Sequence, residues 1–439
     1  MNSIPIKKEL VEQIVQVSGI KNIGTASIRE IKKVINMIEI ASGEKFIRME
    51  MGIPGLPACA IGVQAQIDAL QNKGVAALYP DIEGLPILRT ETKRFCKLFL
   101  DIEVDESGIV PTVGSMMGGM AAFMTFVRLN PQKNTTLFID PGFPVQKQQH
   151  RVLGLNYETF DVYNFRGDKL KAKLESYLSK GNIHSLIYSN PNNPSWICFT
   201  EKELQIIGEL ATKYDTIVIE DLAYLGMDFR KDISQPGLPP FQPTVAKYTD
   251  NYTLLLSASK AFSYAGERIA LMVVSESLFK RHYPGLKPFF GMEELGRALV
   301  YGTIYALTAG TSHSAQYALT AILKACNDGI YNYIDEVKDY AEKAAIMKKL
   351  FLENGFKIVY DKDEDEDIAD GFYFTIAYPG LSGEQLLSEF LYYGISAISL
   401  SITGSERTEG LRACVSLVNR NQFPDLEKRL KIFNENHPL

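Results

Sequence analysis

The segment LLLSASKAFSYAGERIALMVV, residues 254–274, contains two apolar runs separated by a polar turn. Unbroken apolar runs predict strands buried on both faces, as in a parallel sheet covered by helices. Similar runs occur upstream as LFID at 137–140, LIYSN at 186–190 and TIVIED at 216–221, with amphipathic helical stretches between them. This alternation predicts an α/β fold built around a mostly parallel sheet.

The pattern on either side of these runs predicts a second, smaller domain. Ile, Leu and Val recur at helical spacing over 6–18 and 25–42, and we expect the second helix to be capped by Thr25 or Ser27 and to end at Gly43. A long helical region is expected over 311–353, followed by short strands near 371–377 and 411–418. We therefore predict an N-terminal arm that joins the small domain (1–50), a large domain (51–310) and a smaller α+β domain (311–439).

The composition of the 439 residues excludes several classes of protein. Forty-six basic and fifty-two acidic residues give a net charge of −6, which disfavours nucleic acid as a partner. No window has the apolar length of a membrane span or the apolar core of a secretory signal. The five cysteines are widely spaced and form no metal-binding pattern, and the acidic run DKDEDEDIAD at 361–370 is typical of a solvated loop. We expect a cytoplasmic protein without a bound metal.

Two polar residues at predicted strand ends are candidates for a catalytic or cofactor-binding role. Lys260 comes directly after a predicted buried strand, where lost hydration would lower the pKa of its amine and favour imine formation. The alternative is a lysine at a helix start whose tip reaches water. Asp221 ends another strand with no basic residue nearby in sequence, so a protonated ring nitrogen on a cofactor would be a suitable partner. The alternative role for Asp221 is a helix N-cap.

The residues around Lys260 also predict an anion site. Ser257, Ser259 and Arg268 supply two hydroxyls and a guanidinium, which suit a phosphate dianion. Upstream, GIVPTVGSMMGGMAAFMTFV at 108–127 predicts a strand, a glycine turn and a helix start that leaves N–H groups free for an anion. Its glycines match neither a dinucleotide fingerprint nor a P-loop, and such glycines also serve close packing alone.

Taken together and in this order, several motifs resemble the class I/II aminotransferases, the fold type I family that depends on pyridoxal 5'-phosphate. The resemblance runs from about residue 50 to the C-terminus and implies a large domain with a seven-stranded, mostly parallel sheet flanked by helices. It is carried by the motifs YPDIEGLPILR (79–89), GSMMGG (114–119), DPGFP (140–144), SNPNNPSW (189–196), EDLAY (220–224), SASKAFSYAGERIA (257–270) and LRACVSL (411–417).

The resemblance also implies a role for individual residues. Lys260 would form the internal Schiff base (the internal aldimine) and shuttle the proton, while Asp221 would pair with the pyridinium nitrogen. Asn193 and Tyr224 would hydrogen-bond the phenolic oxygen of the cofactor, and Phe143 would stack on its ring. The implied phosphate ligands are the backbone of Ser115 and Met116, the side chains of Ser257, Ser259 and Arg268, and Tyr79 from the second subunit of a homodimer with shared active sites. Arg412 would bind the substrate α-carboxylate, and Gly52 would lie in the substrate-facing loop.

The predicted activity is transfer of an amino group from an amino acid to a 2-oxo acid in two half-reactions. A lyase, decarboxylase or synthase of the same fold and cofactor is the alternative. A transcription regulator would need a basic DNA-binding segment ahead of residue 50, and an inactive relative is disfavoured by the retained Lys260 and Asp221. Two departures from the family pattern are Trp196, where the family usually has Gly, and Ala270. We expect Trp196 to reshape its loop and pocket access; the sequence leaves the amino-acid substrate open.

Overall fold

The computed structural model describes residues 4–438 and is built around a mixed, mostly parallel seven-stranded sheet. Its strands lie in the order β2-β8-β7-β6-β5-β3-β4, and only β8 runs antiparallel to its neighbours. The bounds are β2 Ile109–Thr112, β3 Thr135–Asp140, β4 Asn156–Asp161, β5 Ile183–Ser189, β6 Ile217–Leu222, β7 Tyr252–Ser257 and β8 Ala270–Val274. The α/β fold predicted from the apolar runs is confirmed.

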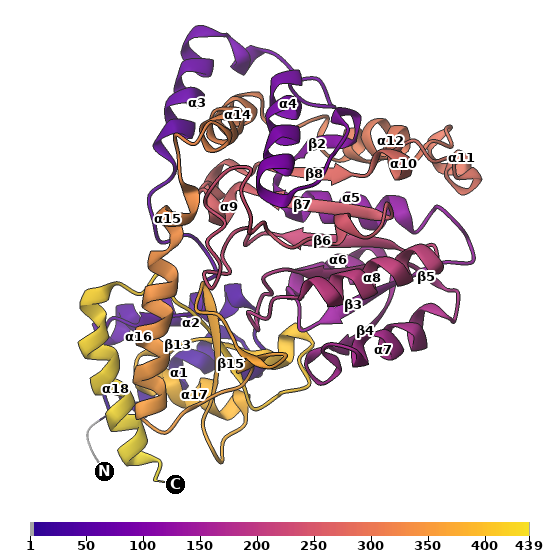
Figure 1. Ribbon diagram of the computed structural model, residues 1–439. Helices are drawn as coiled ribbons and strands as arrows, with labels where there is room; N and C mark the ends of the chain where they lie inside the picture. Colours follow the sequence, from indigo (N-terminus) through magenta and orange to yellow (C-terminus); the bar gives the residue numbers. More distant parts are fainter. Residues whose placement is uncertain (1–3, 439) are drawn as a thin grey trace.

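Both faces of this sheet are buried, which explains why its strands are apolar without alternation. Leu254 and Leu256 of β7 join one core cluster, whereas Leu255 between them joins a second cluster on the other face. The covering helices are α5 (Gly114–Phe126), α6 (Pro144–Leu153), α7 (Lys169–Leu178) and α8 (Glu201–Lys213). Helices α3 (Ala60–Asn72), α4 (Pro86–Phe95) and α14 (His313–Asn327) pack together beyond the β2 edge (Figure 1).

A second, four-stranded antiparallel sheet lies below the large one in Figure 1, in the order β14-β15-β12-β9. Its strands are β9 Lys357–Ile358, β12 Tyr373–Ala377, β14 Ile398–Ser399 and β15 Leu411–Cys414. Beside it, β1 (Ile47–Arg48) pairs in parallel with β13 (Ile395–Ser396), so the N-terminal segment meets the C-terminal one. The helices around these strands are α1 Lys8–Ser18, α2 Ile28–Ser42, α16 Asp339–Glu353, α17 Gly383–Tyr392 and α18 Phe423–Asn436.

The local signals for α2 act as predicted. The Ser27 hydroxyl and the Glu30 carboxylate form a reciprocal capping box at its start, and Gly43 ends it in the left-handed conformation. The helical region expected over 311–353 is divided into α14, α15 (Tyr333–Val337) and α16. Gly329, with a φ of +69°, lies at the break after α14. Glycine ends a helix there because it has no Cβ to oppose a positive φ.

The acidic segment 361–370 differs from the expected solvated loop. It forms a hairpin of β10 (Lys362–Asp363) and β11 (Glu366–Asp367), and Asp363 is buried against the large sheet. Its carboxylate accepts hydrogen bonds from Arg166, Arg230 and the Cys198 backbone N–H. Two guanidinium groups from distant parts of the chain compensate the buried charge, which no local pattern could indicate.

The remaining short helices connect the larger elements. They are α9 Ala258–Ala261, α10 Glu276–Phe279, α11 Lys287–Phe290, α12 Leu295–Arg297 and α13 Tyr305–Thr308. Across residues 4–438, no helix combines the length and the apolar character that crossing a bilayer requires.

Candidate active site

The carboxyl ends of β6 and β7 bring Asp221 and Lys260 into one buried region. The two strands are parallel neighbours, with Asp221 opposite Leu255, and Lys260 lies in α9 directly after β7. Burial lowers the pKa of the Lys260 amine, while the Asp221 carboxylate opposes that shift. Burial raises the pKa of Asp221 to about 6, although Lys260 acts to lower it. Both pKa shifts favour the neutral forms, because the free-energy cost of desolvating each charged group exceeds the attraction between the two charges.

The Asp221 carboxylate has one satisfied and one unsatisfied oxygen. Gln146 of α6 donates to Oδ2 at 3.1 Å, whereas Oδ1 is buried and accepts no hydrogen bond within residues 4–438. A buried acceptor without a partner is costly, so this oxygen suits a donor supplied by a ligand. The structure thus places Asp221 at the end of a strand, and the alternative of a helix N-cap is wrong.

Two other polar strand ends serve the fold instead. Asp140, the last residue of β3, forms a buried ion pair with Lys147 at 2.6 Å, and the Lys147 ammonium also donates to the Thr403 carbonyl at 3.1 Å. Asn190, after β5, accepts a hydrogen bond from the Phe199 N–H within the turn. These contacts tie the sheet to neighbouring segments, so proximity to the strand ends alone does not define the site.

Of the residues expected to bind an anion, Arg268 lies against the start of α5. The Arg268 guanidinium packs so closely on Gly114 that a Cβ there would overlap it, and Gly114 has a φ of +71°. Ser115 and Met116 follow in the first turn of α5, whose N–H groups have no partner within the helix. Ser257 ends β7 and accepts from the Ser259 N–H at 3.2 Å. Arg268 also acts electrostatically on Lys260, so the anion cluster adjoins the lysine.

Tyr224, Asn193 and Arg412 form a third group beside the lysine. The Lys260 ammonium lies 6.0 Å from the centroid of the Tyr224 ring. Arg412, buried on β15, donates through Nη2 to the Glu50 carbonyl at 2.5 Å and through Nη1 to Asn193 Oδ1 at 3.4 Å. Its Nε–H is buried without an acceptor in the described chain, which leaves donor capacity for a carboxylate.

Three predicted residues have fewer contacts with this group. Phe143 is the N-cap residue of α6, and its carbonyl accepts a hydrogen bond from the N–H of Gln146, the residue that bonds Asp221. Gly52 abuts the hydroxyl of Tyr373, where a Cβ would overlap the oxygen. Tyr79 is 90% exposed, and within residues 4–438 its side chain makes no hydrogen bond to the site.

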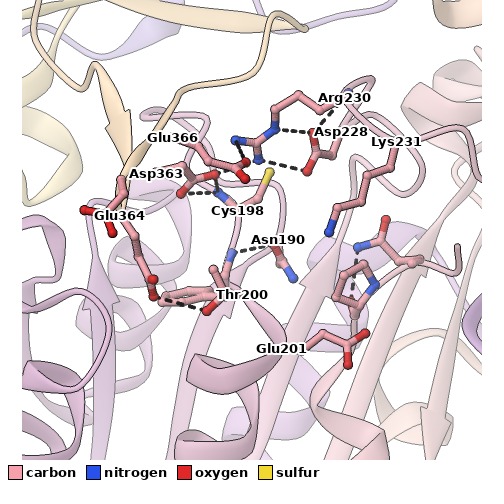
Figure 2. A pocket seen from close by; sticks show the side chains of 14 residues that line it. Asn190, Cys198, Thr200, Glu201, Asp228, Arg230, Lys231, Asp363, Glu364 and Glu366 are labelled. Atoms are coloured by element: carbon pink, nitrogen blue, oxygen red, sulfur yellow. Dashed lines mark hydrogen bonds and ion pairs between the residues drawn. The ribbon is translucent and has the colours of Figure 1, made fainter.

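A different pocket lies on the other side of the NPNNPSW turn, where Figure 2 shows charged side chains facing one another. It has a volume of about 270 Å³ and is lined by Cys198, Asp228, Arg230, Asp363 and neighbouring side chains. Arg230 and Asp228 form an ion pair at 2.8 Å, and Arg230 bonds Asp363 at 2.8 Å. These charges satisfy one another, and none of the predicted site residues lines this pocket.

The family model for aminotransferase class I and II matches residues 47–415. The chain belongs to the class I and II aminotransferases. The match spans most of the sequence and includes every site segment considered above.

Individual relatives of this aminotransferase are distant in sequence. A probable aspartate aminotransferase of Methanocaldococcus jannaschii is 22% identical over 423 residues, covering 95% of this chain and 98% of the relative. An LL-diaminopimelate aminotransferase of Halothermothrix orenii is 29% identical over 215 residues, covering 48% and 53%. The structure of a Mycobacterium tuberculosis aminotransferase superposes with a TM-score of 0.75 at 16% identity, covering 93% and 96%. At that identity the superposition establishes the fold, which is fold type I.

Sequence reasoning missed several residues of the aminotransferase site. Gln146 lies one turn after the DPGFP motif and bonds Asp221, but an amide on a helix carries no signal of its own. The Glu50 carbonyl and Tyr373 both contact Arg412, and each comes from a segment with no recognisable motif. Tyr373 reaches Arg412 because β12 pairs with β15, and Glu50 does so because the neighbouring Met49 carbonyl accepts a hydrogen bond from the Cys414 N–H.

Proposed function

We propose that this aminotransferase uses pyridoxal 5'-phosphate, held by Lys260, Asp221 and the anion cluster around Arg268, to move amino groups between amino acids and 2-oxo acids. The observation that carries the proposal is the buried Asp221 Oδ1 without a hydrogen-bond donor, beside the partly buried Lys260. The donor groups present fit the cofactor, because a carboxylate suits a ring N–H and an arginine with free helix N–H groups suits a phosphate.

When bound, pyridoxal phosphate supplies an aldehyde that combines with amines and a ring that withdraws electrons from the substrate α-carbon. Lys260 supplies the amine, and its lowered pKa raises the fraction of the nucleophilic neutral form. Once free, the same amine would carry the proton between the substrate α-carbon and C4' of the cofactor, the carbon on the other side of the imine nitrogen. Asp221 keeps the ring nitrogen protonated through charge pairing in a dry environment.

The other residues orient the two partners. Tyr224 and Asn193 would donate to the phenolic oxygen of the cofactor, and Phe143 would stack on its ring. Arg412 would bind the substrate carboxylate near Gly52, and this orientation would favour deprotonation of the α-carbon over decarboxylation. The backbone of Ser115 and Met116 and the hydroxyls of Ser257 and Ser259 would donate hydrogen bonds to the phosphate, and the Arg268 guanidinium would supply positive charge.

The proposal extends to a homodimer and to the cytoplasm. Tyr79 is largely exposed, as expected of a side chain that reaches the phosphate of a second subunit. Ile67 and Leu70 of α3 and Leu78 are exposed apolar residues in the same region, which supports an interface there.

All five cysteines are free, which suits a reducing compartment. The large domain over 51–310 and the small domain over 311–439, with residues 1–50 joining the latter, stay a prediction.

Borohydride reduction tests the central assignment. The purified protein reconstituted with pyridoxal phosphate should be yellow, and reduction should leave the pyridoxyl group on the peptide that contains Lys260. Lys147, the buried lysine of α6, is the internal comparison, since it is ion-paired and should stay unlabelled. A label on any other lysine would overturn the assignment.

A second measurement tests the reaction. Adding single amino acids should bleach the visible absorbance of the holoenzyme, and a 2-oxo acid should restore it, with the amino group recovered on the added acid. Release of ammonia or carbon dioxide in proportion to turnover would instead favour a lyase or a decarboxylase. The amino acid that bleaches the colour fastest identifies the preferred substrate.

A further inference from the structure

Tyr373 lies between the two groups that face the cofactor and the substrate, although no motif includes it. It is buried on β12, next to β15, which carries Arg412. Its hydroxyl is 2.8 Å from the hydroxyl of Tyr224, and the Arg412 guanidinium carbon lies 4.4 Å from the centroid of its ring. One side chain therefore contacts both the proposed partner of the phenolic oxygen and the proposed partner of the α-carboxylate.

Trp196 packs against both rings of the pair formed by Tyr224 and Tyr373. Its buried indole meets the ring of Tyr224 edge-on at 5.3 Å and that of Tyr373 at 6.0 Å. It has a φ of +66° and packs on Gly371, where a Cβ would overlap the indole. A tryptophan rarely adopts positive φ, so this backbone conformation is held by the surrounding packing. The rings of Tyr224 and Tyr373 consequently have little freedom to move apart.

The number of protons on the two hydroxyls limits which hydrogen bonds Tyr224 and Tyr373 can make. Each phenol has one proton to donate, and the two hydroxyls can be bonded in either direction. If Tyr224 donated to Tyr373, it would have no proton for a ligand oxygen. If Tyr373 donates, Tyr224 accepts and its own proton stays available. Across the described residues the Tyr373 hydroxyl has no other hydrogen-bond partner, so donation to Tyr224 satisfies it.

We propose that Tyr373 is a positioning residue with two separable effects: its hydroxyl donates to Tyr224 and so directs the Tyr224 proton to the cofactor oxygen, and its ring holds the Arg412 guanidinium for the substrate carboxylate. This inference rests on the proposed function. It extends that function because it links the cofactor side of the site to the carboxylate side through one residue.

Two substitutions separate the effects. Tyr373→Phe keeps the ring but removes the donor, so Tyr224 bonds the cofactor oxygen less well. The midpoint pH of the visible absorbance change of the holoenzyme should rise by roughly 0.4 to 1 unit, the equivalent of one neutral hydrogen bond. The KM for the amino acid should stay near the wild-type value. Tyr373→Leu also removes the ring, so KM should rise by roughly 3- to 30-fold, the range expected for a cation–π contact.

A matched control and a reference complete the design. Tyr378 is a buried tyrosine that follows β12, and its hydroxyl lies 2.7 Å from Asn434 Oδ1 and 2.6 Å from the His437 carbonyl oxygen, so its proton is used away from the site. Tyr378→Phe should therefore change neither the absorbance midpoint nor KM. Tyr224→Phe sets the scale, since it removes the donor to the cofactor altogether and should move the midpoint in the same direction as Tyr373→Phe but further.

The outcomes are distinct. An unchanged midpoint in folded Tyr373→Phe, or an equal shift in Tyr378→Phe, would reduce Tyr373 to a packing residue and overturn the inference. Should Tyr373→Phe fail to fold, Gly52→Ala gives a second test, because its methyl group would displace the Tyr373 hydroxyl and should raise the midpoint as well. Wild-type protein that forms no borohydride-trapped adduct at Lys260 would instead refute the proposed function itself.

Discussion

Replacing Asp221 with asparagine should stabilise the cofactor-free protein at neutral pH while removing its aminotransferase activity. The folded-state pKa of about 6 lies above the ordinary value of 3.8 because burial penalises the charged carboxylate. At 1.4 kcal/mol per unit, a difference of about 2 units corresponds to about 3 kcal/mol. Asparagine has nearly the same shape and carries no charge, so it avoids that cost.

The sign of the pH dependence follows from the direction of the shift. Because the folded protein holds the Asp221 proton more tightly than the unfolded chain, the wild-type protein loses stability as pH rises from about 4 to about 6. The advantage of Asp221→Asn should therefore be absent below pH 4, reach about half its full size at pH 5 and be complete above pH 7.

Urea unfolding of both proteins without cofactor, at pH 5 and pH 8, measures the effect. Trp196 is the only tryptophan of the chain and lies beside the site, so its fluorescence follows unfolding there. Equal stability of the two proteins at pH 8, or a gain that does not shrink at pH 5, would refute the reasoning.

Asp215, ahead of β6 at the opposite end, provides a control of opposite sign. Burial raises the pKa of Asp215, but two hydrogen bonds from Arg281 outweigh this and the net pKa is lowered. Asp215→Asn should therefore destabilise the protein at pH 8. Because the pair is about half exposed, we expect a loss of at most about 1 kcal/mol.

Three further outcomes are expected. Arg412→Ala should raise the KM for amino acids at least tenfold and leave the cofactor absorbance in place, measured by titration of the holoenzyme with substrate. Asp363→Asn should lower the free energy of unfolding by about 3 kcal/mol in urea, because Arg166 and Arg230 would lose their buried partner. Trp196→Gly should lower the melting temperature, since a cavity costing about 3 kcal/mol outweighs about 1 kcal/mol of relieved backbone strain.

Patterns of a few consecutive residues predicted the buried strands, the ends of α2 and the desolvated amine of Lys260. Continuous apolar runs indicated strands with two buried faces, and the Ser27 and Gly43 signals marked both ends of α2. The position of Lys260 directly after a strand indicated a desolvated amine, in agreement with the lowered pKa of its side chain. These features depend on a few consecutive residues, and a short window of sequence contains all the information that they need.

Contacts between distant segments were beyond the reach of such reasoning. Asp363 belongs to an acidic run that is typical of a solvated loop, yet it is buried between two arginines from the segments that follow β4 and β6. Tyr373 becomes part of the site only because β12 pairs with β15 beside the ends of β6 and β7. Residue types determine which charges and hydrogen bonds are available, but long-range packing determines which groups are desolvated together. The sequence by itself thus determined the chemical groups and the layered α/β architecture, and only the tertiary structure decided which of those groups act on one another.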